Sequence, residues 1–376
     1  MDISEWFSAR FAQVRQLPGM QHIERHWLTI SFLFGFVVDN LTLSRVDRVF
    51  DNIALASNVV LAMVSLLILY TATAGKLPKK ISERYEQFVR EWSEVLLQFV
   101  FGNLLSGLLV FYSRSGSWWE SWPFLLVILA VMIGNERLTR RGERLLLNLT
   151  MLFVGLFSYM ALIVPVVLGK MGAWIFVLSG ALALALMYGF VRLLALIVPN
   201  FIRANMRMIA FTLGLTYVIL NFLYFTNIIP PIPLSLKELG VYHNVEKLEN
   251  GSYALTYEQG KWYEFFKDSD TAFHYQTGDT VYCFASVFAP TRLSTEIFHR
   301  WEYYVPEDHE WRTHSRLSYG IDGGRDGGFR GYSWVRHPTE GKWRCTVETA
   351  RKQVLGSETF EVVGGRVPSG LVTELR

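Results

Sequence analysis

The chain has 376 residues, of which 51% are hydrophobic and 15% aromatic, and its formal net charge is +3. So apolar a composition excludes an ordinary soluble protein, and the lack of a basic patch excludes nucleic acid as a partner. The charge is unevenly divided. From Ser235 onward there are 17 basic and 20 acidic residues, whereas the part before it has 19 basic and 13 acidic residues. This division is typical of cations that flank membrane segments, so we expect the lipid bilayer as one partner.

The first 24 residues are predicted to form a cytoplasmic, interfacial amphipathic helix. Between Met1 and Leu17, apolar residues recur at helical spacing with Arg10 and Arg15 among them. This pattern favours a helix lying on the membrane surface, with a partner-binding helix as the alternative. Because an apolar core followed by a small-residue cleavage site is missing from residues 1–21, we expect no cleavable signal peptide.

Residues 25–229 are predicted to form a polytopic α-helical membrane domain. Hydropathy favours seven transmembrane helices, near Trp27–Leu43, Ile53–Ala74, Trp92–Tyr112, Trp118–Gly134, Leu145–Leu168, Trp174–Val198 and Met208–Ile229. The last is followed by Pro230, Pro231 and Pro233, which cannot supply the N–H groups of a continuing helix. Residues 230–240 are therefore predicted to be a proline-rich exit linker.

Loop charge predicts the orientation of these helices. Fifteen lysines and arginines fall in loops on the side of the N-terminus, against four (Arg45, Arg48, Arg114 and Lys170) in the opposite loops. Loops rich in Lys and Arg stay in the cytoplasm. With an odd number of spans, we expect a cytoplasmic N-terminus and a C-terminal domain on the outer side.

Residues 241–376 are predicted to form an all-β, antiparallel, immunoglobulin-like sandwich of about 130 residues. The hydrophobic period changes to two, and turn signals such as Asn250-Gly251 and Glu340-Gly341 separate short β-branched or aromatic runs. The runs are SYALTYEQ, KWYEFF, TVYCFASVF, EIFHRWEYY, WRTHSRLSY, FRGYSWVRH, KWRCTVET and SETFEVV.

The two cysteines of the chain, Cys283 and Cys345, lie in two of these predicted strands. Alternation along each strand puts both side chains on the core face. In the oxidising compartment that the topology implies, a Cys283–Cys345 disulfide is one expectation, and two small buried thiols are the alternative.

The outer hairpin between the first two predicted spans is dense in charge. Asp39, Asp47 and Asp51 are candidate acid or base residues, because paired carboxylates perform such work, and Arg45 and Arg48 are candidate ligands for a phosphate. The alternative is a mutually neutralised ion-pair cluster that caps two helices. Asp39 is the only charge expected within the membrane, which counts against an ion-coupled transporter.

A glycine-rich loop, IDGGRDGGFRGYS, contains the candidate ligand-binding residues Arg325, Asp326 and Arg330. Its glycines allow backbone N–H groups to converge on an anion, and arginines add bidentate contacts. The alternative is a glycine-dependent hairpin whose arginines pair with Asp322 and Asp326.

Histidines and motifs give no sign of a metal or a cofactor. His299 is predicted to be a hydrogen-bonded core residue. His309, His314 and His337 lack metal-ligand spacing, and no nucleophile elbow, Walker sequence or zinc-protease motif occurs. We therefore expect neither a bound metal nor a cofactor.

Three segments, FHRWEYY, FRGYSWVRHPTEGKWRCTVET and QVLGSETFEVV, resemble the bacterial envelope domain called domain of unknown function 2914. The likeness covers about Val281 to Val363. The positions that carry it are His299, Arg300, Trp301, Arg330, Ser333, Gly341, Lys342, Trp343, Arg344, Leu355, Gly356, Phe360 and Val362. The resemblance implies a β-rich domain in the bacterial periplasm and no established reaction.

These observations favour a bacterial inner-membrane protein without catalytic activity. Its periplasmic sandwich would bind a cell-wall glycan such as peptidoglycan, another glycan, or a protein. The alternative is a membrane-embedded enzyme that acts on a lipid-linked or glycan substrate at the periplasmic face. A transporter or channel is the third hypothesis.

Overall fold

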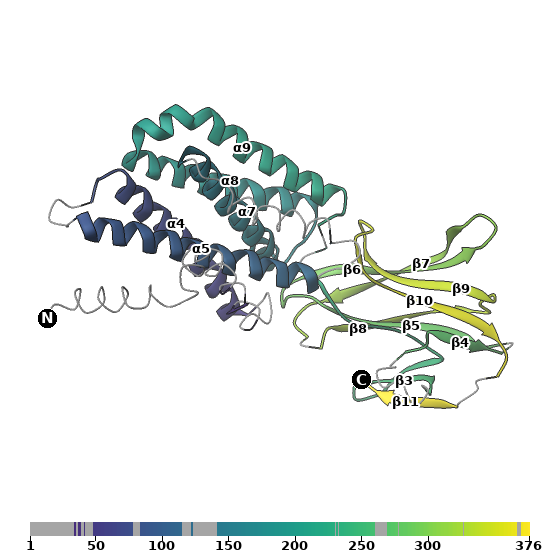
Figure 1. Cartoon of the computed structure of the whole chain (residues 1–376). Coiled ribbons are helices and arrows are strands. Elements are labelled where there is room, and N and C mark those ends of the chain that lie inside the picture. The colour runs from purple at the N-terminus through teal and green to yellow at the C-terminus, as the bar shows by residue number, and fades with distance from the viewer. Residues whose placement is uncertain are drawn as a thin grey trace, which may run out of the picture. The chain divides into compact units, whose positions relative to one another are not determined.

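The computed structural model (Figure 1) describes residues 34, 37–38, 41, 48–77, 83–114, 122, 141–229, 231, 233–259, 269–276, 278–325, 327–366 and 370–376. Its long helices are α4 (Val49–Thr73), α5 (Glu83–Arg114), α7 (Arg141–Leu168), α8 (Ala173–Ile197) and α9 (Pro199–Phe225). The chain divides into two compact units. One holds α4 and most of α5, α7, α8 and α9. The other holds every described strand together with Ala161–Val177 and the chain from Leu220 onward.

Four helices are long and apolar enough to cross a membrane: α4, Leu145–Leu168 of α7, α8 and α9. Each has 24 to 27 residues. At about 1.5 Å per residue, this length exceeds the ~30 Å hydrocarbon core of a bilayer. These helices coincide with four of the predicted spans, and they support a membrane protein.

The structure supports four of the predicted spans among the described residues, and the count of seven is not supported. The predicted span Trp92–Tyr112 lies within α5, which is not among the four candidate spans. The charged run that opens α5, from Glu83 to Glu94, makes its first turns polar. The predicted spans at 27–43 and 118–134 fall almost wholly outside the described residues, as does the predicted helix at 1–24.

Glycines allow close packing between the helices of the first unit. A Cβ atom on Gly155 of α7 would lie 2.1 Å from a methyl carbon of Leu104 on α5. A Cβ atom on Gly180 of α8 would lie 2.4 Å from the ring of Phe157 and 2.6 Å from that of Tyr217. Small residues at such points let membrane helices approach closely.

Strands of the second unit form three sheets. In chain order they are β1 (Ser235–Tyr242), β2 (Asn244–Lys247), β3 (Tyr253–Glu258), β4 (Ala272–Tyr275), β5 (Thr280–Phe288), β6 (Ser294–Val305), β7 (Glu310–Asp322), β8 (Phe329–Arg336), β9 (Gly341–Thr349), β10 (Val354–Gly364) and β11 (Leu371–Leu375). The strand orders are β1-β5-β8, β4-β10-β9-β6-β7 and β11-β3-β2.

Two features differ from the predicted sandwich. β4 runs parallel to β10, with Phe273 opposite Val362, so the sandwich is not wholly antiparallel. β1 begins at Ser235, inside the predicted linker 230–240, because it pairs along its length with the apolar strand β5. Pairing with a buried neighbour overrides the weak strand pattern of SLKELGVY.

The sheets β1-β5-β8 and β4-β10-β9-β6-β7 pack face to face around one core (Figure 1). Cys283 on β5 and Cys345 on β9 form a disulfide that joins them, and neither cysteine is exposed. Trp301, Trp343 and Phe360 lie in the same cluster. A buried tryptophan beside an inter-sheet disulfide is the arrangement found in immunoglobulin-type sandwiches.

Within the second unit, the end of α9 contacts the turn between β9 and β10. The guanidinium carbon of Arg351 lies 4.2 Å from the ring centre of Tyr224, and Asn227 donates from Nδ2 to the Arg351 carbonyl over 3.2 Å. Gln353 donates from Nε2 to the carbonyl oxygen of Ile229 over 3.3 Å. These contacts supply partners for the polar groups where the chain leaves the helix.

Replacing both cysteines by alanine is expected to lower the free energy of unfolding by roughly 4 kcal/mol, because the bridge closes a long loop. The sequence separation of the two cysteines is 62. Urea unfolding of the full-length protein in detergent, followed by tryptophan fluorescence, measures this change. Dithiothreitol should lower the wild-type midpoint to that of the variant and leave the variant unchanged. Equal midpoints of the oxidised wild type and the variant would contradict the expectation.

Candidate functional site

The outward side of β6, β7 and β9 carries an alternating network of arginines and glutamates. We call this surface the arginine face and define it by Phe298, Arg300, Glu302, Trp311, Arg316, Arg344 and Glu348. Strand alternation places it there: His299 and Trp301 are fully buried in the core, so their neighbours Arg300 and Glu302 project to the opposite side.

Each glutamate of the arginine face is shared by two arginines. Glu302 accepts from Arg300 and from Arg344, whose Nη2 lies 2.7 Å from Oε2. Glu348 accepts from Arg300 Nε over 3.0 Å and from Arg316 Nε over 2.7 Å. The five side chains form one linear network with a net charge of +1, so the buried carboxylates are compensated.

Aromatic rings support two of these arginines. The guanidinium carbon of Arg316 lies 3.8 Å from the ring centre of Phe298, and that of Arg344 lies 4.5 Å from that of Trp311. The side chains of Arg316 and Arg344 are 29% and 28% exposed, whereas that of Glu348 is 0% exposed. The arginine face therefore presents planar cations over aromatic rings, which suits carboxylate and phosphate groups.

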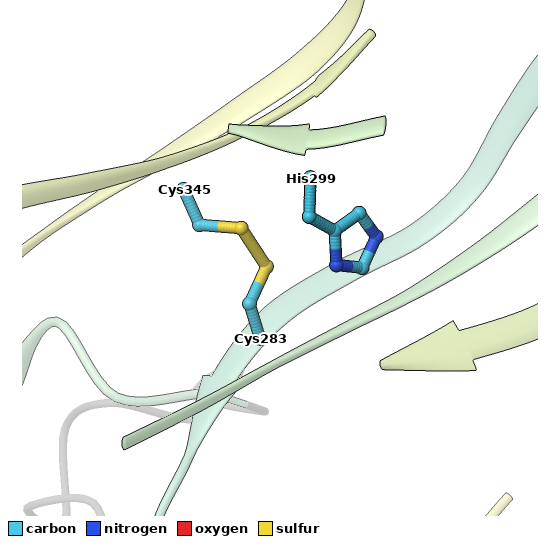
Figure 2. A group of neighbouring side chains, drawn as sticks. All are labelled: Cys283, His299 and Cys345. Atoms are coloured by element: carbon cyan, nitrogen blue, oxygen red, sulfur yellow. A yellow bond between two sulfur atoms is a disulfide. The ribbon is translucent and has the colours of Figure 1, made fainter. Parts of the chain in front are cut away.

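His299 lies on the inner side of β6, beside the disulfide (Figure 2). Its Nδ1 lies 2.9 Å from Ser333 Oγ and its Nε2 lies 3.1 Å from the Tyr319 hydroxyl, so both ring nitrogens have partners. The prediction of a hydrogen-bonded core histidine is confirmed. Cys283, His299 and Cys345 lie close enough to share a metal ion, but cysteine binds metals as a thiolate. Because both sulfurs are in a disulfide, these three residues have a structural role in this state.

Residues of the glycine-rich loop have separate contacts. The Arg325 guanidinium carbon lies 5.0 Å from the ring centre of Phe329, and Arg330 donates from Nη1 to the Arg376 carbonyl oxygen over 3.1 Å. A Cβ atom on Gly323 would lie 1.7 Å from the carbonyl oxygen of Pro290. The loop joins β7 to β8, which belong to different sheets, so the alternative of a hairpin between two paired strands is wrong. Anion binding by Arg325 and Arg330 stays a prediction. Asp326 lies outside the described residues.

Few residues of the predicted outer hairpin are described. Asp39, Arg45 and Asp47 lie outside the described residues. Arg48 is exposed at the N-cap of α4, and Asp51 lies in the first turn of that helix, 2% exposed. A carboxylate in a first helical turn is favoured by the helix dipole. Asp51 is therefore a buried residue in the first turn of α4. A site formed jointly by Asp39, Asp47 and Asp51 stays a prediction.

The structure also brings together residues that the sequence reasoning missed: His243, Glu258, Asp270 and His274. Glu258 ends β3, and its carboxylate lies 3.1 Å from His243 Nε2 and 2.8 Å from His274 Nδ1. Asp270 Oδ1 accepts the Glu258 backbone N–H over 2.8 Å. His243, Glu258 and Asp270 are separated from one another in sequence by a dozen or more positions, and only His274 lies close to Asp270, so no short motif indicates the cluster.

Burial and hydrogen bonding set the protonation of this cluster. Burial lowers the pKa of His243, against the opposing effect of the nearby Glu258 carboxylate. Burial alone would raise the pKa of Glu258, but the backbone N–H of His274 and the rings of His243 and His274 bring the pKa below its ordinary value. A neutral imidazole therefore faces an ionised carboxylate near neutral pH.

Burial lowers the pKa of His299 from 6.5 to about 4, so the unfolded chain binds a proton between these pH values that the folded state does not. The contribution of this pKa shift to the free energy of unfolding is fully present above pH 6.5. It should be lost, by roughly 3 kcal/mol, as the pH drops to about 4. Urea unfolding at pH 7 and pH 4.5 should show a smaller loss for His299→Gln than for wild type. His314→Gln, at an exposed histidine, should retain the wild-type loss. Equal losses in wild type and His299→Gln would contradict this origin.

Comparisons with solved structures give only distant likenesses. An immunoglobulin-like protein from Pseudomonas aeruginosa is 12% identical, with a TM-score of 0.19; the match covers 34% of this chain and 97% of that chain. A β-glucosidase from Listeria innocua in complex with gluconolactone is 10% identical, with a TM-score of 0.19 and coverage of 31% and 16%. A Pseudomonas fluorescens alkylpurine DNA glycosylase bound to DNA is 8% identical, with a TM-score of 0.21 and coverage of 85% and 100%. Likenesses at this level support no conclusion about activity.

The family comparison is more informative. The search of curated proteins found no match. Residues 294–362 match the family described as Protein of unknown function (DUF2914). This segment begins with β6, ends within β10 and includes the whole arginine face. The resemblance predicted from the strand segments is confirmed, and the C-terminal region of this chain carries a DUF2914 segment.

Proposed function

We propose that this protein is a bacterial inner-membrane protein whose C-terminal sandwich lies in the periplasm and binds the peptide-bearing glycan of the cell wall without catalysis. Four candidate spans support the membrane location. The excess of fifteen cations over four on the side of the N-terminus supports a cytoplasmic N-terminus. The Cys283–Cys345 disulfide is in keeping with an oxidising compartment.

The arginine face is the observation that carries the binding function. Arg316 and Arg344 lie over aromatic rings and stay partly exposed, while their partner glutamates are buried. The fixed guanidinium planes are pre-organised, so little side-chain entropy is lost when they bind a carboxylate. Recognition by such a surface requires no bond to be made or broken in the ligand.

Peptidoglycan has the chemistry that this surface would recognise. Its peptide stems carry carboxylates, which suit bidentate contacts with arginine. The C–H faces of its sugars can pack on exposed parts of Trp311, which is half-buried, and Tyr304, whose ring centre lies 5.3 Å from that of Trp311. A planar cationic surface with aromatic rings therefore matches both parts of this polymer.

A reporter enzyme that folds only in an oxidising compartment, fused after Arg376, should be active in intact cells, because an odd number of spans would export the C-terminus. The same reporter fused after Lys76, in a loop rich in cations, should be inactive. Reporter activity normalised to the amount of fusion protein measures this. Activity at Lys76 and none at Arg376 would overturn the proposed location.

Replacing Arg316 and Arg344 together by lysine should weaken binding of soluble peptidoglycan fragments at least tenfold, because lysine keeps the charge but loses the planar bidentate contact. Titration calorimetry with the full-length protein in detergent measures the affinity, and wild-type binding should also weaken as salt is added.

Arg312→Lys is the matched control for this experiment. Arg312 lies on the same strand but pairs with Asp308 at an exposed position, away from the arginine face. This variant should bind as wild type does. Wild-type protein that binds no fragment, or unchanged affinity in the Arg316→Lys/Arg344→Lys variant with an unaltered unfolding midpoint, would refute the proposed function.

A further inference from the structure

Three sheets of the second unit meet at the cluster of His243, Glu258, Asp270 and His274. His243 directly follows β1, which belongs to the sheet β1-β5-β8. Glu258 ends β3 of the sheet β11-β3-β2, and His274 lies in β4, at one end of the five-stranded sheet. Asp270 precedes β4. A single ligand held here would therefore join all three sheets.

The donor atoms of three of these residues are spaced as metal ligands are. His243 Nε2 lies 3.1 Å from Glu258 Oε1 and 3.8 Å from Asp270 Oδ2. The three donor atoms lie within 4.8 Å of one another. Ligands about 2.0–2.1 Å from a tetrahedral zinc ion are about 3.3 Å apart, so small shifts would bring this set onto one ion.

Burial and charge favour a divalent cation at this place. Asp270 is 0% exposed and Glu258 is 3% exposed. Two buried carboxylates that face one point repel each other, and buried charges are normally paired or bound to metals. The charge of a divalent cation is equal in size and opposite in sign to that of the two ionised carboxylates.

Surrounding contacts hold the three donors in place. His274 donates to Glu258 from its backbone N over 2.7 Å and faces the same carboxylate with Nδ1. The backbone N of His243 donates to the Thr256 carbonyl oxygen over 2.8 Å, and the His243 ring stacks on Phe273 with ring centres 4.0 Å apart. Metal-binding carboxylates are commonly oriented by such hydrogen bonds.

We propose that His243, Glu258 and Asp270 bind one divalent transition-metal ion, with His274 as the positioning residue for Glu258. Imidazole nitrogen and carboxylate oxygen suit Zn²⁺, which binds more tightly than Mn²⁺ to the same ligands. On binding, the ring proton of His243 lies on Nδ1, the Nε2 lone pair binds the metal, and the hydrogen bond from Nε2 to Glu258 is lost. The ion then links the end of β1, the end of β3 and the segment before β4.

Titration of tag-free, EDTA-treated full-length protein in detergent with ZnCl₂ tests the proposal. Calorimetry should show one zinc ion bound per chain, with weaker binding of Mn²⁺, and zinc should raise the unfolding temperature. Asp270→Asn and Glu258→Gln keep the shape of the side chains and should weaken zinc binding at least a hundredfold. His274→Gln should weaken it about tenfold to a hundredfold with the stoichiometry unchanged.

His314→Gln is the control, because His314 is exposed and outside the cluster. This variant should bind zinc as wild type does. X-ray absorption of the wild-type zinc complex requires no variant and should show nitrogen and oxygen ligands at about 2.0–2.1 Å. The proposal is wrong if wild type binds no zinc, if Asp270→Asn binds it unchanged, or if the absorption spectrum shows sulfur ligands. In that case His243, Glu258, Asp270 and His274 form a hydrogen-bonded cluster that binds no metal.

Discussion

The architecture of the second unit depends on the contact between β5 and β9. Both strands bury almost every residue of their C-terminal halves, and the Cys283–Cys345 bridge joins them at zero exposure. Around that bridge lie Trp301 and Trp343, two large aromatic residues of the buried cluster between the two sheets. β8 pairs with β5 and β6 pairs with β9, so each of the two bridged strands has a hydrogen-bonded neighbour in its own sheet.

Among the described residues, no further strands pack on the outer side of the five-stranded sheet, so side chains of the sheet itself cover it. The arginine face does this by placing guanidinium groups and aromatic rings over buried glutamates. Loss of one arginine would leave a desolvated carboxylate with half its compensation, which costs more than an exposed ion pair is worth. Residues that suit a ligand are therefore also residues on which the sheet depends, and the lysine variants separate the two contributions.

Much of the sandwich was predictable because period-two patterns survive wherever a strand is long and faces the core. TVYCFASVF and KWRCTVET correspond almost residue for residue to β5 and β9. β2 and β4 have only four residues each, too few for a periodic signal, and the parallel pairing of β4 with β10 depends on tertiary contacts. The metal-ligand cluster was missed for the same reason, since His243, Glu258 and Asp270 meet only after three sheets have formed.

The membrane part was predictable to a lesser degree. Helices α4, α7, α8 and α9 stand out because an uninterrupted apolar run is a strong signal. Helix α5 is harder to interpret, since the charges through Glu94 give way to apolar residues only in its second half. Hydropathy identifies single apolar helices well. The predicted number of spans is less reliable, because every ambiguous helix adds its own error to the count.

Strand β7 ends the five-stranded sheet, with β6 on one side only, and extends over 13 residues. Such an open margin offers backbone groups to which another copy of the chain could add while the chain folds. Arg312, His314 and Arg316 are exposed along it, and Leu317 is the one large apolar side chain exposed there. Charged side chains on an exposed edge strand disfavour pairing with the edge of a second chain, and Arg312 and Arg316 are of this kind.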